Sequence, residues 1–301
     1  MPKHVLLTGG SGLIGRHLTQ LLLDNGYEVS HLSRTPENDS RVKTFLWNVK
    51  KNEIDAACIT GVDTIVHLAG AGVAEKRWTD KRKKEIIESR TRSIWLIYDL
   101  LKKKNHLVKS VISASATGFY GDRDGQILTE HTTPGDDFLA EVCLKWEAAV
   151  DEGVELGLRI VKLRTGIVLD KNGGALPQMA NPVKWGIGSP LGDGRQWMPW
   201  IHWQDVAYLY FYAITNTKLK GVYNMAAPNP VTNQQFTLVL AKQLHRPLWA
   251  PKVPAFLLKL LFGEMSIVIL GSAKVSCQKI EETGFKFKYS DLAAALNEIY
   301  G

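Results

Sequence analysis

The sequence TGGSGLIG, residues 8–15, decides the fold of this chain. It follows the short apolar run Val5-Leu6-Leu7, which has the character of a buried strand. It precedes a segment with apolar residues at helical spacing, which Asn25-Gly26 closes with residues that tolerate a left-handed C-cap. A glycine turn between a strand and a helix is the context in which G-x-G-x-x-G, here Gly10, Gly12 and Gly15, indicates dinucleotide binding.

Each glycine of this loop has a physical role. The early glycines permit a tight turn, the middle one lets the backbone approach a pyrophosphate, and the last lets the helix pack close to the strand. The amides at the helix N-terminus then face the phosphates, where the helix dipole favours negative charge. An ordinary glycine turn is the alternative, and the strand and helix on either side argue against it.

The end of the second expected strand distinguishes between the two nicotinamide dinucleotides. An NAD-binding protein usually ends this strand with Asp or Glu, which binds the ribose hydroxyls. Here the strand ends Leu32-Ser33-Arg34-Thr35, without a carboxylate. Ser33 can donate to a phosphate, and Arg34 can pair with it through two parallel hydrogen bonds. The sequence therefore predicts NADP(H); the alternative is that Arg34 is merely exposed.

Strand-like and helix-like segments alternate along the first half of the chain. The expected strands after the first are 28–32, 44–47, 63–68, 110–113, 158–163 and 221–225, and the later helices are about 81–103 and 137–151. Such alternation predicts a parallel sheet covered on both faces, with right-handed crossovers. The expected fold class is α/β, a Rossmann-type doubly wound parallel sheet with a smaller α/β substrate lobe at the C-terminus.

Small and polar residues stand where the expected strands end. Ligands of such a sheet bind at the carboxyl ends of its strands. Besides the glycine loop, these ends carry Ser33-Arg34, Ala69-Gly70, Ser113-Ala114-Ser115 and Arg164-Thr165-Gly166. We therefore expect the site at one edge of the sheet.

The character of the sequence changes after residue 165. Glycines and prolines alternate with apolar pieces, and the stretch from about Asn233 predicts helices. We expect a cofactor-binding domain of residues 1–165 plus about 201–228, and a substrate-binding lobe of about 166–200 and 229–301. The apolar stretch Phe256–Leu270 is shorter than a membrane span needs, so we expect a helix pair covered by the domain surface.

The bulk composition excludes several classes of protein. With 45% hydrophobic and 22% charged residues, the 301-residue chain has the composition of a soluble globular protein. Its three cysteines have unrelated spacings and fit neither a disulfide framework nor a zinc site. We therefore expect no metal and a reducing, cytoplasmic compartment. The N-terminus lacks the pattern of a signal peptide.

The formal charge of +7 raises the question of nucleic acid. The basic residues cluster at 81–84 and 102–104, beside acidic residues on an expected helix, which favours a solvated helix face. No helix-turn-helix, finger or RNA-binding pattern accompanies them. We expect a small-molecule substrate and neither nucleic acid nor a membrane as partner. The sequence leaves a homodimer open.

A series of motifs resembles the extended and atypical short-chain dehydrogenases/reductases, and within them the "epimerase family" subgroup. The resemblance covers essentially the whole chain, through TGGSGLIG (8–15), HLAGAGV (67–73), RW (77–78), SRTRS (89–93), SASATGFYG (113–121), KWEAA (145–149), LRTGIVLDKNGGAL (163–176), GDGRQWMPWIHWQD (192–205) and GVYNMAAPNPVTN (221–233). It implies an NADP-binding lobe, a capping substrate lobe, and redox or epimerase chemistry at a carbon–oxygen centre. The expected cofactor contacts are Gly9, Gly10, Ser11, Gly12, Leu13, Ile14, Ser33, Arg34, Leu68, Ala69, Gly70 and Arg90.

The usual catalytic residues of this superfamily are a Ser, a Tyr and a Lys, the last two in the pattern Y-x-x-x-K. The Tyr is the general acid/base beside a hydride transfer, and the Lys lowers its pKa. Ser115 matches the serine by its place after the fifth strand. The Y-x-x-x-K pattern is absent, because Leu139 stands in the tyrosine position and Cys143 in the lysine position. Tyr120 is the nearest tyrosine in the sequence.

This departure leaves two functions open. In the first, Ser115 and Tyr120 are the catalytic residues of an NADP(H)-dependent oxidoreductase or nucleotide-sugar-epimerase-like enzyme. In the second, the chain is an NADPH-binding regulatory protein with little or no catalysis.

The second lobe contains an aromatic segment, Trp197–Asp205, with two interpretations. Its tryptophans could wall an apolar pocket. Alternatively, Asp205 is the N-cap of a following helix and His202 orients the turn. Arg164 and Arg195 are candidates for binding an anionic substrate.

Overall fold

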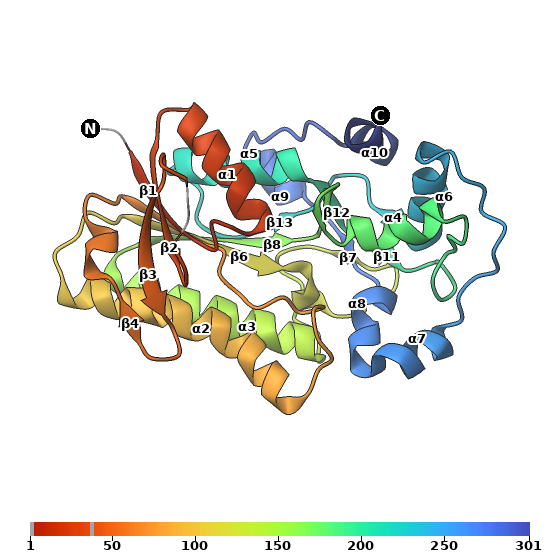
Figure 1. The fold of residues 1–301 in the computed structure, drawn as a ribbon, viewed down its shortest axis with the longest axis horizontal. Helices are drawn as coiled ribbons and strands as arrows, with labels where there is room; N and C mark the ends of the chain where they lie inside the picture. The colour runs from red at the N-terminus through yellow and green to blue at the C-terminus, as the bar shows by residue number, and fades with distance from the viewer. Residues whose placement is uncertain (1–2, 37–38) are drawn as a thin grey trace.

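An eight-stranded sheet forms the centre of the molecule (Figure 1). The structure is a computed structural model that describes residues 3–36 and 39–301. The strands of the sheet are β1 (His4–Thr8), β2 (Glu28–Ser33), β3 (Lys43–Asn48), β4 (Glu53–Ile54), β5 (Thr64–His67), β6 (Ser110–Ala116), β8 (Arg159–Thr165) and β13 (Gly221–Met225). They lie in the order β13-β8-β6-β5-β1-β2-β3-β4, and only the β3–β4 pair is antiparallel.

Helices cover both faces of this sheet (Figure 1). One face carries α1 (Leu13–Asp24) and α5 (Trp203–Thr215), and the other carries α2 (Asp80–Lys103) and α3 (Phe138–Asp151). The doubly wound α/β fold that the sequence predicts is therefore confirmed. The expected strand at 221–225 also returns to the main sheet, where β13 pairs with β8.

Local sequence explains why these elements form where they do. Strand β1 is buried along its whole length, which accounts for its unbroken apolar run. Helix α2 begins after Thr79, whose hydroxyl accepts from the amide of Arg82. Helix α3 begins after Asp137, whose carboxylate accepts from the amide of Ala140. Such N-caps satisfy amides that have no partner within the helix.

The strand order creates a crevice next to β1. Strands β2 and β5 flank β1, and Thr8 is in register with Leu32 on one side and His67 on the other. The connection from β1 contains α1, on one face of the sheet, and the connection from β5 contains α2, on the other face. Ligands of doubly wound sheets bind at such a switch point, outside the carboxyl ends of the strands.

A second set of elements packs beside the carboxyl edge of the sheet. Its strands form three small sheets: β10 (Gly173–Gly174), β9 (Ile167–Asp170) and β12 (Trp200–His202); β11 (Trp197–Met198) and β14 (Val231–Thr232); β15 (Lys274–Val275) and β7 (Ile127–Leu128). Its helices are α4 (Leu176–Lys184), α6 (Asn233–Gln243), α7 (Ala255–Phe262), α8 (Ile267–Leu270), α9 (Gln278–Glu282) and α10 (Leu292–Tyr300). Short 3-10 turns are η1 (Ala56–Ile59), η2 (Thr117–Tyr120), η3 (Glu152–Leu156) and η4 (Gly263–Ser266). An apolar core of its own holds this part together, around Leu176, Trp200, Phe236 and Leu296.

Three residues of the aromatic segment of this lobe, Trp200, His202 and Asp205, have structural roles. Trp200 is buried in the second core. The N-cap of α5 is His202, whose Nδ1 accepts from the amide of Gln204 at 3.2 Å. The expectation that Asp205 caps this helix is wrong, because its carboxylate accepts the amides of Lys288 and Tyr289 instead.

The expectation of a covered helix pair at 256–270 is also wrong. The apolar residues do form α7, η4 and α8. However, the outer side of this segment is not covered by the described parts of the chain, and Leu260 is 75% exposed.

Candidate functional site

The glycine loop lies between β1 and α1. Gly9 has φ +70°, a backbone conformation that L side chains rarely adopt. Gly12 is the N-cap residue of α1 and supplies no side-chain acceptor, so the first amides of the helix point to the loop without a cap. A Cβ at Gly15 would collide with the carbonyl oxygens of Gly9 and Gly10. The loop can therefore approach the helix this closely only with glycine at position 15.

The ends of β2 and β5 flank this loop. Leu68 and Ala69 both donate their amides to the hydroxyl of Thr8 at 3.1 Å, which fixes the end of β5 against the end of β1. Ser33 ends β2, and Arg34 follows it as an exposed residue. The structure thus brings the loop, both strand ends and Arg34 to one edge of the sheet.

Arg90 supports the chain that leaves β5. Its guanidinium is buried, donates to the carbonyl oxygens of Ala71 and Ile86 at 3.0 and 2.9 Å, and lies 4.9 Å from the ring centroid of Trp146. Burial lowers the pKa of Arg90 to about 10, so it stays charged at neutral pH. A Cβ at Gly70 would lie 2.9 Å from the Arg90 guanidinium carbon. Arg90 therefore sits directly beneath the 70–71 loop.

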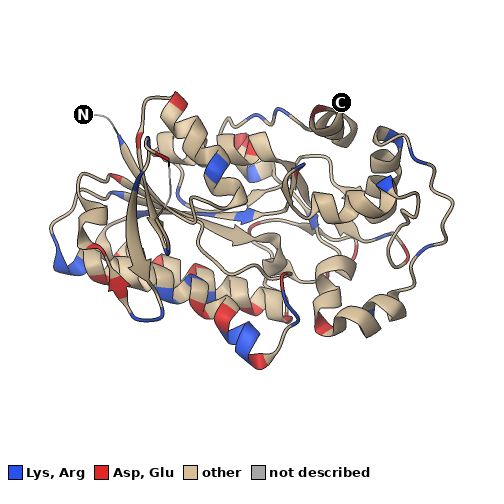
Figure 2. Cartoon of the chain, viewed as in Figure 1, with Lys and Arg blue, Asp and Glu red and all other residues tan. Residues whose placement is uncertain are grey.

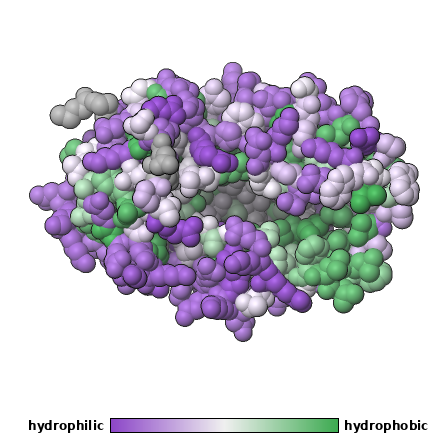
Figure 3. Space-filling model, viewed as in Figure 1, coloured by the Kyte–Doolittle hydropathy of each residue, from purple (hydrophilic) through white to green (hydrophobic). Residues whose placement is uncertain are grey.

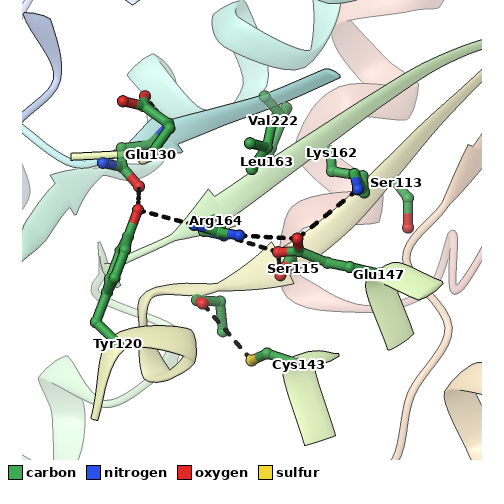
Figure 4. Close-up of polar contacts among 12 residues, drawn as sticks. Ser113, Ser115, Tyr120, Glu130, Cys143, Glu147, Lys162, Leu163, Arg164 and Val222 are labelled. Atoms are coloured by element: carbon green, nitrogen blue, oxygen red, sulfur yellow. Dashed lines mark hydrogen bonds and ion pairs between the residues drawn. The ribbon is translucent and has the colours of Figure 1, made fainter. Parts of the chain in front are cut away.

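A buried ion pair connects β6, β8 and α3 (Figure 4). Glu147 on α3 receives hydrogen bonds from Arg164 Nε at 2.8 Å and from Ser115 Oγ at 2.7 Å, both on Oε1. Arg164 also donates to Glu147 Oε2 at 2.9 Å. Burial lowers the pKa of Arg164, but the hydrogen bonds and the charge of Glu147 more than offset this, and the net shift is upward. The Arg164 guanidinium is therefore held in its charged form.

Lys162 extends this network toward solvent. Its ammonium lies 3.8 Å from Glu147 Oε2 and 2.6 Å from an oxygen of Asp151, whose side chain is half exposed. The sequence alone indicates no role for Glu147 or Lys162. The spacing of Leu139, Cys143 and Glu147, four residues apart, could have indicated one helix face directed at the strand ends.

The two expected catalytic residues both belong to this network. Ser115 lies inside β6 rather than after it, because the strand extends to Ala116, and its hydroxyl donates to Glu147. Tyr120 is fully buried, donates to Asn224 Oδ1 at 2.6 Å and accepts from Arg164 at 3.1 Å. Burial raises the pKa of Tyr120, against the opposing effect of Arg164, so the phenol stays protonated at neutral pH.

The face of α3 above this network is apolar. Leu139 packs against Gly118, where a Cβ would lie 3.1 Å from the Leu139 Cβ. The thiol of Cys143 donates to the carbonyl oxygen of Ala116 at 3.6 Å. Burial raises the pKa of Cys143 to about 12, and the charge of Glu147 adds to the effect. Neither position supplies a proton donor or acceptor comparable with Tyr and Lys.

The two arginine candidates for substrate binding have different surroundings. Arg164 is buried and paired with Glu147, and its guanidinium lies 3.3 Å from the ring centroid of Phe119. Its guanidinium is therefore occupied by contacts within the protein. Arg195 is exposed in the loop before β11.

Two adjoining cavities lie between the helical layer and the second lobe, and Ile267 lines both. The larger, of about 820 Å³, has Trp78 and Phe138 in edge-to-face contact at 4.7 Å on its wall. The smaller, of about 390 Å³, is lined by residues of α7 and α8 and by the 192–196 loop. The face drawn in Figure 3 is hollowed near its centre. In the sequence, Trp78 stands out only as part of the RW motif, and Phe138 has no distinguishing pattern.

The second lobe also touches the glycine-loop helix directly. His17 on α1 hydrogen-bonds Asp170 at 2.6 Å and stacks on Trp203 at a centroid distance of 4.1 Å. A Cβ at Gly173 would lie 3.0 Å from the Leu13 side chain. The loop is therefore held from both sides.

This architecture matches a known family. The family model for the NAD dependent epimerase/dehydratase family matches residues 5–226. The chain belongs to this family. A second family model, a domain of unknown function (DUF1731), matches residues 253–299, which include α7, α8, α9 and all but the last residue of α10.

Similar proteins of this epimerase/dehydratase family extend over the whole chain. The epimerase family protein YfhF of Bacillus subtilis is 36% identical over 98% of this chain and 97% of its own length. The crystal structure of human epimerase family protein SDR39U1 with NADPH has a TM-score of 0.87 at 31% identity and covers 99% of both chains. A nucleoside-diphosphate sugar epimerase from Corynebacterium glutamicum has a TM-score of 0.82 at 33% identity, over all of this chain and 59% of that one.

The glycine-loop edge of this family member fits a dinucleotide. The absence of a Cβ at Gly10 and Gly15 lets the His31 ring and the start of α1 pack closely against the turn, and the uncapped amides of α1 are donors that suit a pyrophosphate. Arg34 adds an exposed cation at the end of β2. The donors present are thus of the type that binds phosphate.

Proposed function

We propose that the chain is an NADP(H)-dependent oxidoreductase or nucleotide-sugar-epimerase-like enzyme that acts at a carbonyl or hydroxyl carbon of a small molecule. The observation that carries the cofactor choice is the end of β2, where Ser33 and exposed Arg34 stand without a carboxylate. An arginine beside a serine suits a 2′-phosphate, whereas a carboxylate would repel it. The NADPH in the human relative supports the same choice.

The proposed cofactor site is the loop edge. The amides of Ser11, Gly12, Leu13 and Ile14 would receive the pyrophosphate, with Gly9 and Gly10 forming the turn. Leu68, Ala69 and Gly70 would line the opposite side, and Arg90 would hold their loop in place. A bound nicotinamide dinucleotide supplies or accepts a hydride.

Ser115 and Tyr120 enter the proposal as members of the Glu147–Arg164 network. Because Ser115 donates its proton to Glu147, its free lone pairs can accept a hydrogen bond but its hydroxyl cannot donate a second one. We infer that this network holds the end of β6 and η2 in place for substrate. Thr117, the first residue of η2, is the hydroxyl that follows the strand and would be its contact with substrate.

The cofactor proposal is tested by titrating wild type and Arg34→Ala with NADPH and NADH. We expect wild type to prefer NADPH at least tenfold, and Arg34→Ala to lose affinity for NADPH without losing affinity for NADH. Lys43→Ala, which removes a cation from the start of the neighbouring β3, is the matched control. Equal affinities of wild type for the two cofactors would contradict the proposal.

The reaction is tested by NADPH oxidation against a panel of carbonyl compounds, including nucleotide sugars. We expect turnover that Thr117→Val and Ser115→Ala both lower, with loss of kcat rather than of NADPH affinity. If Thr117→Val leaves turnover unchanged, Thr117 is not the contact.

An NADPH-binding regulatory protein is the second candidate. The apolar Leu139 and Cys143 face of α3 and the raised pKa of Tyr120 favour it, because neither supplies an acid matched to neutral pH. Tight NADPH binding without turnover on any compound of the panel would support this second function. The three cysteines of the chain are free thiols. Free thiols support a reducing, cytoplasmic compartment, whichever of the two functions the protein has.

A further inference from the structure

The ring of His31, on β2, lies directly against Gly10 of the glycine turn. A Cβ at Gly10 would lie 2.4 Å from each of three His31 ring atoms, Cε1, Nδ1 and Nε2. Because these three distances are equal, the Cβ would stand over the face of the imidazole. The ring therefore occupies the space that a side chain at position 10 would need.

The backbone at Gly10 does not itself require glycine. Gly9 has a φ of +70°, whereas the φ of Gly10 lies outside the left-handed region. An alanine can therefore adopt the conformation of Gly10 but not that of Gly9 without strain. In dinucleotide-binding loops such glycines serve the tight turn and the close approach of the pyrophosphate. At position 10 of this chain, the atoms nearest to an added Cβ belong instead to a side chain of the protein, His31.

A hydrogen bond to α1 holds the ring in this position. The hydroxyl of Thr19 lies 2.8 Å from His31 Nε2, and both side chains are buried. The ring cannot rotate away from an added Cβ without breaking this bond. Thr19 follows Gly15 by one helical turn on the buried face of α1, and a Cβ at Gly15 would collide with the carbonyl oxygen of Gly10. His31 and α1 thus enclose the turn from two sides.

The contacts between α1 and this turn involve uncharged residues. Of Asp, Glu, Lys and Arg, α1 contains only Arg16 in its first turn and Asp24 at its end, and Figure 2 shows the helix tan between them. Gly15 and Thr19, which contact the turn and the ring, carry no charge. Packing and one hydrogen bond therefore set the spacing between the turn and the helix.

We propose that His31 is a positioning residue of the cofactor site. Its ring sets the distance between Gly10 and the first amides of α1, and it is the reason why position 10 is glycine. This role rests on the proposed function, in which those amides receive the pyrophosphate. His31 and Ser33 lie two residues apart on the same side of β2, so the ring also adjoins the strand end proposed to bind the 2′-phosphate.

A double-mutant cycle in NADPH affinity, measured by isothermal titration on the full chain, tests this role. We expect Gly10→Ala alone to lower the affinity by about tenfold or more, because the Cβ pushes the turn away from the buried ring. His31→Ala alone is expected to lower the affinity as well, since the turn loses its support. In the His31→Ala background the space against position 10 is open, and Gly10→Ala should then change the affinity by about twofold or less.

His4→Ala is the matched control. His4 is also a buried histidine, its Nε2 lies 2.9 Å from the Ser30 hydroxyl, and it begins β1, whose other end carries the glycine turn. We expect His4→Ala to lower the free energy of unfolding, measured by urea denaturation without cofactor, and to leave NADPH affinity unchanged. In this background Gly10→Ala should be as harmful to NADPH affinity as it is in wild type.

The role of His31 is overturned if Gly10→Ala lowers NADPH affinity equally in wild type and in the His31→Ala background, because the cofactor itself would then require glycine. It is also overturned if His31→Ala alone leaves the affinity unchanged. Failure of wild type to bind either NADPH or NADH would contradict the proposed function together with this role. NADPH binding with an additive cycle contradicts the role of His31 alone.

Discussion

Ser115 on β6 donates its hydroxyl proton to Glu147 on α3, with 2.7 Å between Oγ and Oε1. The same carboxylate oxygen also accepts from Arg164 Nε at 2.8 Å. One buried carboxylate therefore fixes the serine and the arginine together, and it joins a strand end of the sheet to the helix that covers it. The position and charge of Glu147 determine what the serine hydroxyl can do.

Glu147→Gln is expected to destabilise the fold strongly. The substitution keeps the shape of the side chain but leaves the buried Arg164 without a counter-charge. Breaking a buried pair by neutralising one partner costs about 3–5 kcal/mol of the free energy of unfolding. Urea denaturation of wild type and variant measures this difference.

Glu141 offers a matched control on the same helix. It pairs with Lys145 at 2.6 Å, but both side chains are about half exposed. Exposed pairs contribute about 0–1 kcal/mol, so Glu141→Gln should change the free energy of unfolding very little. Equal effects of Glu141→Gln and Glu147→Gln would contradict the role given to the buried pair.

Gly15→Ala is expected to displace the glycine loop. The added Cβ would collide with the carbonyl oxygens of Gly9 and Gly10, which are backbone atoms that cannot rotate away. We expect NADPH affinity to fall at least tenfold. Gly125→Ala is the control, since the nearest atom to its Cβ is 3.7 Å away on Trp197. Isothermal titration of both variants checks this, and an unchanged affinity of Gly15→Ala would mean that the loop does not hold the cofactor.

The doubly wound fold could be predicted from the sequence because the patterns that indicate it are local. An unbroken apolar strand, a glycine turn and helical spacing occur within residues 5–26, and each repeat of strand and helix adds another such signal. The second lobe carries weaker local signals. Asp205 has the residue type and position of an N-cap, yet it binds the amides of Lys288 and Tyr289, more than eighty residues away. No local pattern predicts that contact.

Of the candidate site, only the part at the glycine loop could be predicted from the sequence. The role of Ser115 depends on Glu147, 32 residues later, and on Arg164 on the neighbouring strand. Both are ordinary charged residues in the sequence, and their burial is a property of the assembled layers. From the sequence Arg164 is a candidate for binding an anionic substrate, whereas in the structure it forms an ion pair with Glu147.

The three cysteines are expected to resist alkylation in the folded protein. Burial raises the pKa of Cys58 and Cys143 to about 12 each, and it also raises the pKa of Cys277. At pH 8 a thiol with a pKa of about 12 is a thiolate in about one molecule in ten thousand. Iodoacetamide followed by mass spectrometry should find no label in the native protein and three labels in urea. Rapid labelling of Cys143 in the native state would mean that this part of α3 is open to solvent.

His67 is expected to make the protein less stable below neutral pH. Its ring is fully buried beside Arg90, its Nε2 bonds the hydroxyl of Ser93 at 2.8 Å, and burial lowers its pKa from 6.5 to about 3. Between these two values the unfolded chain takes up a proton that the folded chain does not. The contribution of His67 to the free energy of unfolding is thus complete above about pH 6.5 and falls as pH falls, by up to about 1.4 kcal/mol per pH unit.

His67→Gln isolates this contribution, because glutamine does not titrate and can still reach Ser93. Its free energy of unfolding at pH 8 will be lower than that of wild type, since the amide packs less well. The informative quantity is the slope between pH 6.5 and pH 4.5, measured by urea denaturation at several pH values. Other histidines and carboxylates contribute equally to both proteins and cancel in the comparison. We expect the slope of the variant to be flatter, and parallel slopes would mean that His67 is protonated in the fold.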